Sequence, residues 1–163
     1  MFDPECSYNK ETDYSLVECD AHRKLSYEAA VRSAVLLKND GVLPLDKNTL
    51  KTVAVIGPNA ISTKVLEGNY NGRSGDYRTV LDGVKRVCGD DVRVLYAAGC
   101  PLCALTDESC AGPRDNFAEA LTVAEAADVV ILCMGLDPSI EGEEGDANNE
   151  YGAGDKSGAF PGL

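Results

Sequence analysis

The sequence predicts an α/β fold: a parallel-sheet three-layer sandwich of the flavodoxin-like type. Three short segments, at residues 52–56, 92–97 and 129–134, are almost entirely apolar, and helical patterns separate them. Strands that are apolar on both faces are typical of a parallel sheet that helices cover on both sides.

The first part of the chain is predicted to be a linker followed by a helix. Residues 1–19 are polar, lack periodicity and contain Pro4, so we expect a linker or strap between domains. Asp20 is a favourable N-cap for a helix that continues to about residue 38, where Asn39-Asp40-Gly41 stops it. Apolar residues at helical spacing give this helix a stripe of the kind that covers a sheet. The stripe consists of Tyr27, Ala30, Val31, Ala34 and Leu37.

Strands and helices alternate along the rest of the chain. The expected elements are a strand at 52–56, a helix at 79–88, a strand at 92–97, a helix at 115–127 and a strand at 129–134. Val80, Val84 and Val87 lie along one side of the first of these two helices. Together with the helix that begins at Asp20, this gives about three strands and three helices.

The carboxyl edge of the predicted sheet is the expected functional edge. Because crossovers between parallel strands are right-handed, the strand ends at Gly57, Ala98 and Gly135 should lie side by side. Ligands of open α/β sheets bind beyond this edge. Such sheets more usually have about five or six strands, so we expect residues 20–163 to be a truncated domain.

Composition excludes two classes of partner. The chain has 163 residues and a formal net charge of −12. Binding to nucleic acid or to an anionic membrane needs an excess of Lys and Arg, so we expect neither. No apolar run reaches the ~20 residues that span a bilayer. No signal peptide is visible, which leaves a cytoplasmic and a secreted location both open.

The seven cysteines do not form a familiar metal or disulfide framework. Cys100 and Cys103 form a Cys-x-x-Cys pair with Cys110 nearby, but a zinc site would need a fourth soft ligand, and Cys88 is the only close candidate. We expect free or locally paired thiols, with Cys133 as a small side chain of the core.

Two other ligand motifs are incomplete. The acidic segment at 141–155 lacks the alternating aspartates of a calcium loop. The Gly-Pro-Asn sequence at 57–59 follows a strand, but it lacks the Gly-Lys-Ser/Thr order of a phosphate-binding loop, so we expect a structural turn. Neither a metal nor an organic cofactor is predicted.

A cluster of carboxylates follows the last apolar segment, after Gly135. Carboxylates crowded at a sheet edge raise one another's pKa, which suits a group that donates a proton near neutral pH. A solvated acidic loop is the alternative explanation, and the motif alone leaves both open. The residues are Asp137, Glu141, Glu143, Glu144 and Asp146.

Several segments taken together resemble glycoside hydrolase family 3. Residues 30–45 resemble the helix and turn that open the second domain of that family, and Ile-Gly-Pro-Asn-Ala at 56–60 resembles its first strand end. Gly-Asn-Tyr-Asn-Gly at 68–72 is similar to a loop of the β-xylosidase and β-glucosidase branches. The segment 128–143 is similar to the strand and acidic loop that follow, and Met-Phe-Asp-Pro at 1–4 is similar to the end of the first domain.

The resemblance implies a two-domain enzyme. Residues 1–19 would be the interdomain linker, and residues 20–163 would be the N-terminal part of the C-terminal α/β sandwich domain. A (β/α)8-type first domain, absent from this chain, would carry the aspartate nucleophile of a retaining exo-acting β-glycosidase. This chain would then supply half of an active site and would be inactive alone.

The resemblance also implies site residues. Glu143 would be the acid/base, with Glu141 as the competing assignment, and Glu144 would fit the motif less well. The substrate would be a β-linked oligosaccharide or glycoside, and no cofactor or metal would be needed. The alternative is a non-catalytic α/β binding or interaction module, whose acidic edge binds a cation or a basic protein.

Overall fold

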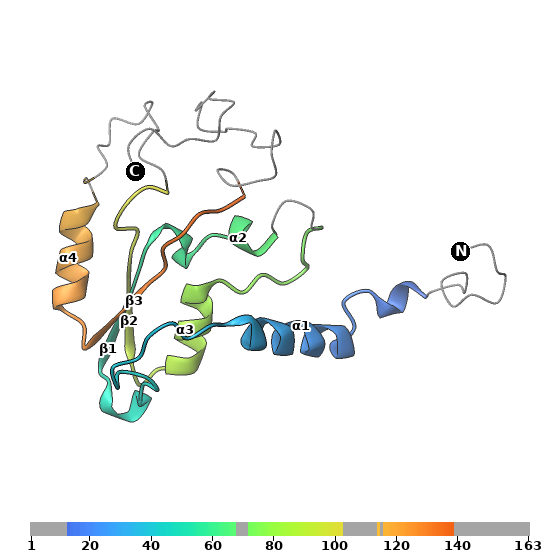
Figure 1. Ribbon diagram of the computed structural model, residues 1–163, viewed down its shortest axis with the longest axis horizontal. Helices are drawn as coiled ribbons and strands as arrows, with labels where there is room; N and C mark the ends of the chain where they lie inside the picture. Colours follow the sequence, from blue (N-terminus) through green and yellow to red (C-terminus); the bar gives the residue numbers. More distant parts are fainter. Residues whose placement is uncertain (1–12, 68–71, 103–113, 115, 139–163) are drawn as a thin grey trace, which may run out of the picture. The chain divides into compact units, whose positions relative to one another are not determined.

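A computed structural model describes residues 13–67, 72–102, 114 and 116–138 (Figure 1). The chain divides into two compact units, and each is considered by itself. The first unit is Met1–Leu45 and the second is Asp46–Leu163. None of the helices in the described ranges is long and apolar enough to cross a membrane.

The first unit contains the helix α1 (Asp20–Ser33), which follows a 3₁₀ turn, η2 (Tyr14–Leu16). The predicted N-cap was wrong by one residue, because Cys19 occupies that position and Asp20 lies in the first turn. A negative charge in the first turn interacts favourably with the helix dipole. The predicted helix stop at Asn39-Asp40-Gly41 was wrong, because α1 ends six residues before Asn39. Asn39 instead forms a local turn, in which its Oδ1 accepts hydrogen bonds from the N–H groups of Gly41 (3.1 Å) and Leu43 (3.0 Å).

The helix α1 is shorter than predicted, ending at Ser33 instead of about residue 38. Ala34 already has extended backbone angles (φ −67°, ψ 128°), and the Ser33 hydroxyl donates to the carbonyl of Ala30 at 2.8 Å. The predicted apolar stripe is not buried, since Tyr27 is 71% exposed and Leu37 is 92% exposed. Helices owe most of their stability to the packing of an apolar face, which explains why this one does not extend further.

The second unit is built around a parallel sheet with the strand order β2-β1-β3. The strands are β1 (Thr52–Ile56), β2 (Arg93–Ala97) and β3 (Val129–Leu132). The central strand β1 pairs in parallel with both neighbours, so that Ile56 lies beside Ala97 on one side and beside Leu132 on the other. The predicted α/β class and parallel sheet are confirmed, and β1 has the predicted bounds.

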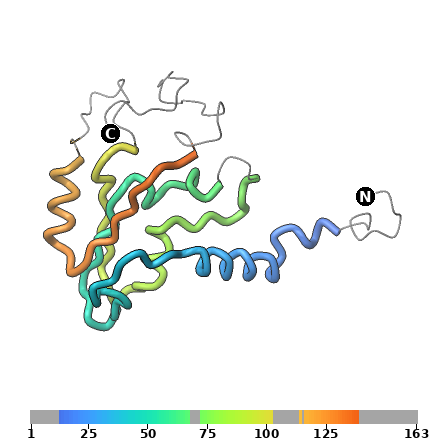
Figure 2. The backbone as a smooth tube through the Cα atoms, in the orientation of Figure 1, coloured from blue at the N-terminus to red at the C-terminus, as the bar shows by residue number. Residues whose placement is uncertain are grey.

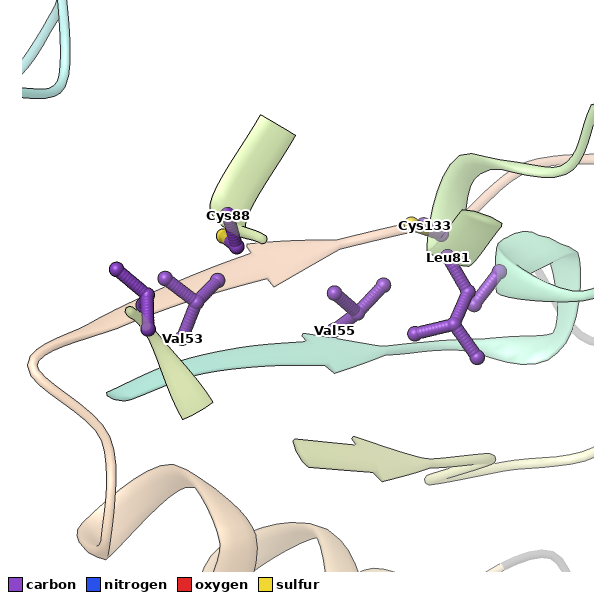
Figure 3. Packing of buried hydrophobic residues seen from close by; sticks show 7 residues of the cluster. Val53, Val55, Leu81, Cys88 and Cys133 are labelled. Atoms are coloured by element: carbon purple, nitrogen blue, oxygen red, sulfur yellow. The ribbon is translucent and has the colours of Figure 1, made fainter. Parts of the chain in front are cut away.

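Helices cover both faces of this sheet, which gives three layers (Figure 1). Side chains of β1 alternate between the faces, as expected for a strand. Val53 and Val55 pack in one cluster with Leu81 and Cys88 of α3 (Val80–Cys88) (Figure 3). Ala54 and Ile56 point to the other face, where α4 (Phe117–Glu125) covers them. The cluster on the α4 side is completed by Ala97 and by the partly buried Ala120, Val123, Ala124 and Ala127.

The buried side of α3 differs from the one predicted. Leu81 and Cys88 are buried and Val84 packs against them, whereas Val80 and Val87 are 44% and 68% exposed. The buried residues are spaced i, i+3 and i+7, which is also a valid helical stripe. Both stripes are apolar in the sequence, and contact with the sheet selects the one that contains Leu81.

Short elements fill the connections. The turn η3 (Lys47–Thr49) precedes β1, and the turn η4 (Pro58–Ala60) follows it, in agreement with the structural turn expected at Gly-Pro-Asn. The short helix α2 (Lys64–Glu67) lies between η4 and α3 and was not predicted. A capping box begins α3: the Thr79 Oγ1 accepts from the N–H of Asp82 (3.2 Å), and the Asp82 carboxylate accepts from the N–H of Thr79 (3.3 Å).

Candidate active site

The three strands end at the same edge of the sheet, and a glycine follows each of them within three residues. The chain leaves β1, β2 and β3 at the same edge of the sheet (Figure 2). Gly57, Gly99 and Gly135 have φ angles of 134°, 75° and 136° there. Only glycine adopts such angles readily, so the backbone after each strand has a conformation that larger residues disfavour. The predicted common edge at Gly57, Ala98 and Gly135 is confirmed.

Gly57 lies very close to the backbone of Cys133, the residue that follows β3. A Cβ atom at this position would lie 2.3 Å from the carbonyl oxygen of Cys133. The N–H of Gly57 donates to the carbonyl of Ala97 at 3.1 Å, so this residue also connects to β2. The close packing leaves no room for a side chain between the strand ends.

Asn59 joins the ends of β1 and β3. Its backbone N–H donates to the carbonyl of Cys133 at 3.2 Å, and its side-chain Nδ2 donates to the carbonyl of Gly135 at 3.0 Å. The sequence predicts a turn at this position but no role for the side-chain amide. The signal that could have indicated this role is an asparagine shortly after a strand end. At such a position a polar side chain can bond the carbonyls of the neighbouring strand.

The carboxylate-rich segment, which runs from Asp137 to Asp146 in the sequence, begins two residues after this contact. Asp137 is the only one of the five carboxylate residues that falls in the described part of the chain, and it is 7% exposed. Glu141 and Glu143, the two predicted acid/base candidates, lie outside the described residues, as do Glu144 and Asp146. The structure therefore places the start of this loop at the carboxyl edge.

A side-chain hydrogen bond in the part of the chain between β1 and α3 was not predicted. The Tyr77 hydroxyl donates a hydrogen bond to the Glu67 carboxylate at the end of α2. This bond raises the pKa of Tyr77, and burial acts in the same direction. It brings together the two residues that border the segment 68–76.

Asp128 has a structural role at the opposite edge of the sheet. One oxygen of its carboxylate accepts hydrogen bonds from the backbone N–H groups of Lys51 (2.7 Å) and Thr52 (2.8 Å). These two hydrogen bonds, the one from Lys51 first, lower the pKa of Asp128. The carboxylate thus fixes the start of β3 against the start of β1.

Replacing Asp128 by alanine is expected to lower the free energy of unfolding at pH 7, because the two N–H groups lose their acceptor. The folded-state pKa is depressed from the ordinary value of 3.8, so this stabilisation is present above that value and is lost as the pH falls through the folded-state pKa. Urea unfolding over a pH series should therefore show the difference between wild type and variant shrinking in acid. Asp91→Ala, at an exposed carboxylate before β2, is the control, and an equal loss in both variants would contradict the assignment.

The cysteines in the described ranges are free thiols: Cys19, Cys88, Cys100 and Cys133. Cys133 lies in the core cluster on the α3 face, as predicted, and burial raises the pKa of its thiol. Cys103 and Cys110 lie outside the described residues. Within the described part of the chain, His, Cys, Asp and Glu side chains do not gather into a group that could hold a metal ion.

The fold and this edge define a class of protein: an α/β sandwich domain in which β3 is followed by Gly135 and then, in the sequence, by a carboxylate-rich segment. The sequence model of the glycosyl hydrolase family 3 C-terminal domain matches residues 34–156. The chain therefore belongs to glycosyl hydrolase family 3, within its C-terminal domain.

Relatives in this family are β-xylosidases by name. A β-xylosidase from Formosa agariphila is 38% identical over 146 residues, covering 84% of this chain and 19% of the relative. β-D-xylosidase 1 from Arabidopsis thaliana is 42% identical over 127 residues, covering 77% of this chain and 15% of the relative. The chain thus spans about a fifth or less of the length of these relatives.

Solved structures agree with the fold. A family 3 exo-β-xylosidase in complex with a xylobiose aziridine activity-based probe has a TM-score of 0.68 and 40% sequence identity, covering 86% of this chain and 17% of the other. A β-glucosidase from intestinal bacteria, involved in saponin metabolism, has a TM-score of 0.64 and 27% identity, covering 77% of this chain and 20% of the other. Both likenesses support the predicted three-layer α/β architecture.

Proposed function

We propose that this chain is part of the second domain of a retaining exo-acting β-glycosidase, and that it supplies the acid/base glutamate to an active site shared with a (β/α)8-type domain. The observation that carries the proposal is the exit of β3. The chain leaves β3 at the carboxyl edge through Gly135, and several carboxylates follow in the sequence. Membership of glycosyl hydrolase family 3 supports a role for one of them in glycoside hydrolysis.

The chemistry of retention needs two carboxyl groups. They lie roughly 5–5.5 Å apart across the scissile bond; one is a nucleophile and the other first donates and then accepts a proton. In this proposal Glu143 protonates the leaving oxygen and later deprotonates the attacking water, and Glu141 is the competing candidate. The nucleophile is an aspartate on the other domain, and no metal or organic cofactor takes part.

A β-xyloside is the substrate class that the comparisons favour. The curated relatives named β-xylosidases are 34–46% identical to this chain, whereas the solved β-glucosidases are 27–29% identical. The proposal therefore places a terminal β-linked xylose ahead of glucose as the sugar released.

The test uses the longer protein that contains this chain. It should hydrolyse an aryl β-xyloside with retention, so that the first-formed sugar seen by proton NMR is the β-anomer. This chain alone should show no turnover above buffer, because half of the site is missing. An inverted product would overturn the mechanism, and turnover by the isolated chain would overturn the shared site. An inactive full-length protein would instead support the non-catalytic module.

A further inference from the structure

We propose that Asn59 is a positioning residue for the acid/base glutamate: its amide holds the backbone at Gly135, from which the chain continues toward Glu141 and Glu143. This inference rests on the proposed function and adds a residue to it. Asn59 lies 76 positions before Gly135 in the sequence, yet it bonds to that residue directly.

The contact continues the sheet beyond its last backbone pair. The regular pairing of β1 with β3 ends near Cys133, whose N–H donates to the carbonyl of Ile56 at 2.7 Å. After Gly57 the first strand turns away into η4, so its backbone no longer follows β3. Asn59 provides the next hydrogen bonds to this segment: its backbone N–H donates to the carbonyl of Cys133, and its side-chain Nδ2 donates to the carbonyl of Gly135. One residue thus holds two alternate carbonyls of the segment that leaves β3.

The orientation of the amide is determined by this bond. Nδ2 is the donor to the carbonyl of Gly135, while no donor among the described residues reaches the buried Oδ1. A flipped amide would bring Oδ1 against the carbonyl oxygen, and two acceptors repel each other. Asn59→Asp has nearly the same shape and produces this repulsion, because an ionised carboxylate has acceptors only.

The hydrogen bond between Asn59 and Gly135 lies just before the carboxylate-rich segment, which begins two residues later at Asp137. Gly135, whose carbonyl Asn59 holds, has a φ of 136°, an angle that glycine alone adopts readily. Asp137, two residues further on, is buried and marks a second fixed point. Glu141 and Glu143 follow four and six positions later. A misplacement of a catalytic group by about 1 Å can cost ~10²-fold in rate, so a shift at Gly135 should affect proton transfer.

The experiment compares Asn59→Asp with Asn48→Asp in the full-length enzyme. Asn48 is exposed in η3, and its amide bonds locally to Asp46 at 2.9 Å, so it provides a matched change of charge away from the carboxyl edge. The probes are aryl β-xylosides whose leaving phenols range from strongly acidic to weakly acidic. We expect Asn59→Asp to lower kcat/KM by about 10-fold or more for the poorest leaving group and by much less for the best, since only the former needs the acid. Asn48→Asp should leave the series unchanged.

A second variant and a reference make the outcome decisive. Asn59→Ser adds no charge and removes the long donor, so it should show the same trend if Asn59→Asp fails to fold. A uniform loss across all leaving groups, or the loss of folding in both variants, would assign Asn59 to stability alone and overturn the inference. The same series with Glu143→Gln and Glu141→Gln provides the reference. If one of these steepens the dependence and the Asn59 variants do not, only this inference fails; if neither does, the proposed function fails with it.

Discussion

Replacing Glu143 by glutamine in the full-length enzyme is expected to slow the hydrolysis of substrates with poor leaving groups by roughly 10²–10⁴-fold, the usual contribution of a general acid. Glutamine keeps the shape of the side chain but cannot donate a proton to the leaving oxygen. Substrates whose leaving group departs without protonation should form the glycosyl-enzyme at a nearly normal rate. The measurement is kcat/KM for a series of aryl β-xylosides against the pKa of the released phenol.

Glu141→Gln is the matched control for this prediction. It removes one carboxylate of the same loop two positions earlier and makes the same change of charge. We expect a shallow and uniform effect from it. If Glu141→Gln gives the steep dependence instead, the acid/base role belongs to Glu141. If both variants are flat, this loop does not supply the acid.

The second large effect is expected from Gly57→Ala, which should reduce the free energy of unfolding by about 3 kcal/mol or more. The backbone angles at Gly57 (φ 134°, ψ 158°) belong to a region that is essentially restricted to glycine, and a side chain there costs of order 1–3 kcal/mol. The added Cβ would also lie 2.3 Å from the Cys133 carbonyl oxygen, so the ends of β1 and β3 would have to separate. A loss of this size is a large fraction of the ~5–15 kcal/mol that stabilises a typical domain.

Two other glycines separate these contributions in urea unfolding followed by circular dichroism. Gly89 has a φ of 61°, and a Cβ there would meet nothing within 4 Å, so Gly89→Ala isolates the cost of the backbone angle. Gly83 lies inside α3 with open space around it, and Gly83→Ala should raise stability by roughly 0.5–1 kcal/mol. A Gly57→Ala variant no less stable than Gly89→Ala would contradict the predicted clash.

Much of the fold could be predicted because its strands and helices are encoded by residues that are close together in the sequence. The strand predicted at 52–56 has the same bounds as β1. The helix predicted at 79–88 agrees with α3 to within one residue, and Thr79 and Asp82 form its capping box. The apolar pattern was a poorer guide where a helix has two apolar sides that could each be buried. Val80 and Val87 compete with Leu81 and Cys88 for the buried side of α3, and both sets have helical spacing. The end of α1 was also misplaced, since the apolar residues 34–37 favour continuing a helix only if their face is buried.

The sequence predicted the edge of the sheet at which the candidate site lies, but not the side-chain contacts at that edge. The common edge at Gly57 and Gly135 followed from the handedness of crossovers, and the structure confirms it. The bond between Asn59 and Gly135 did not follow, because its partners are separated by 76 positions and no local pattern links them. The role of Asp128 did not follow either: its carboxylate accepts hydrogen bonds from the N–H groups of Lys51 and Thr52, which lie 77 and 76 positions earlier.

The sequence by itself therefore determined the α/β class, the strands, the family and the loop that holds the candidate acids. These depend on periodicity and on residue types at fixed spacing, which a linear chain displays directly. The tertiary structure alone decided which side of α3 is buried, why Gly57 must be glycine and which side chain holds the exit of β3. Such contacts arise from the register between strands distant in the sequence, and that register exists only once the chain has folded.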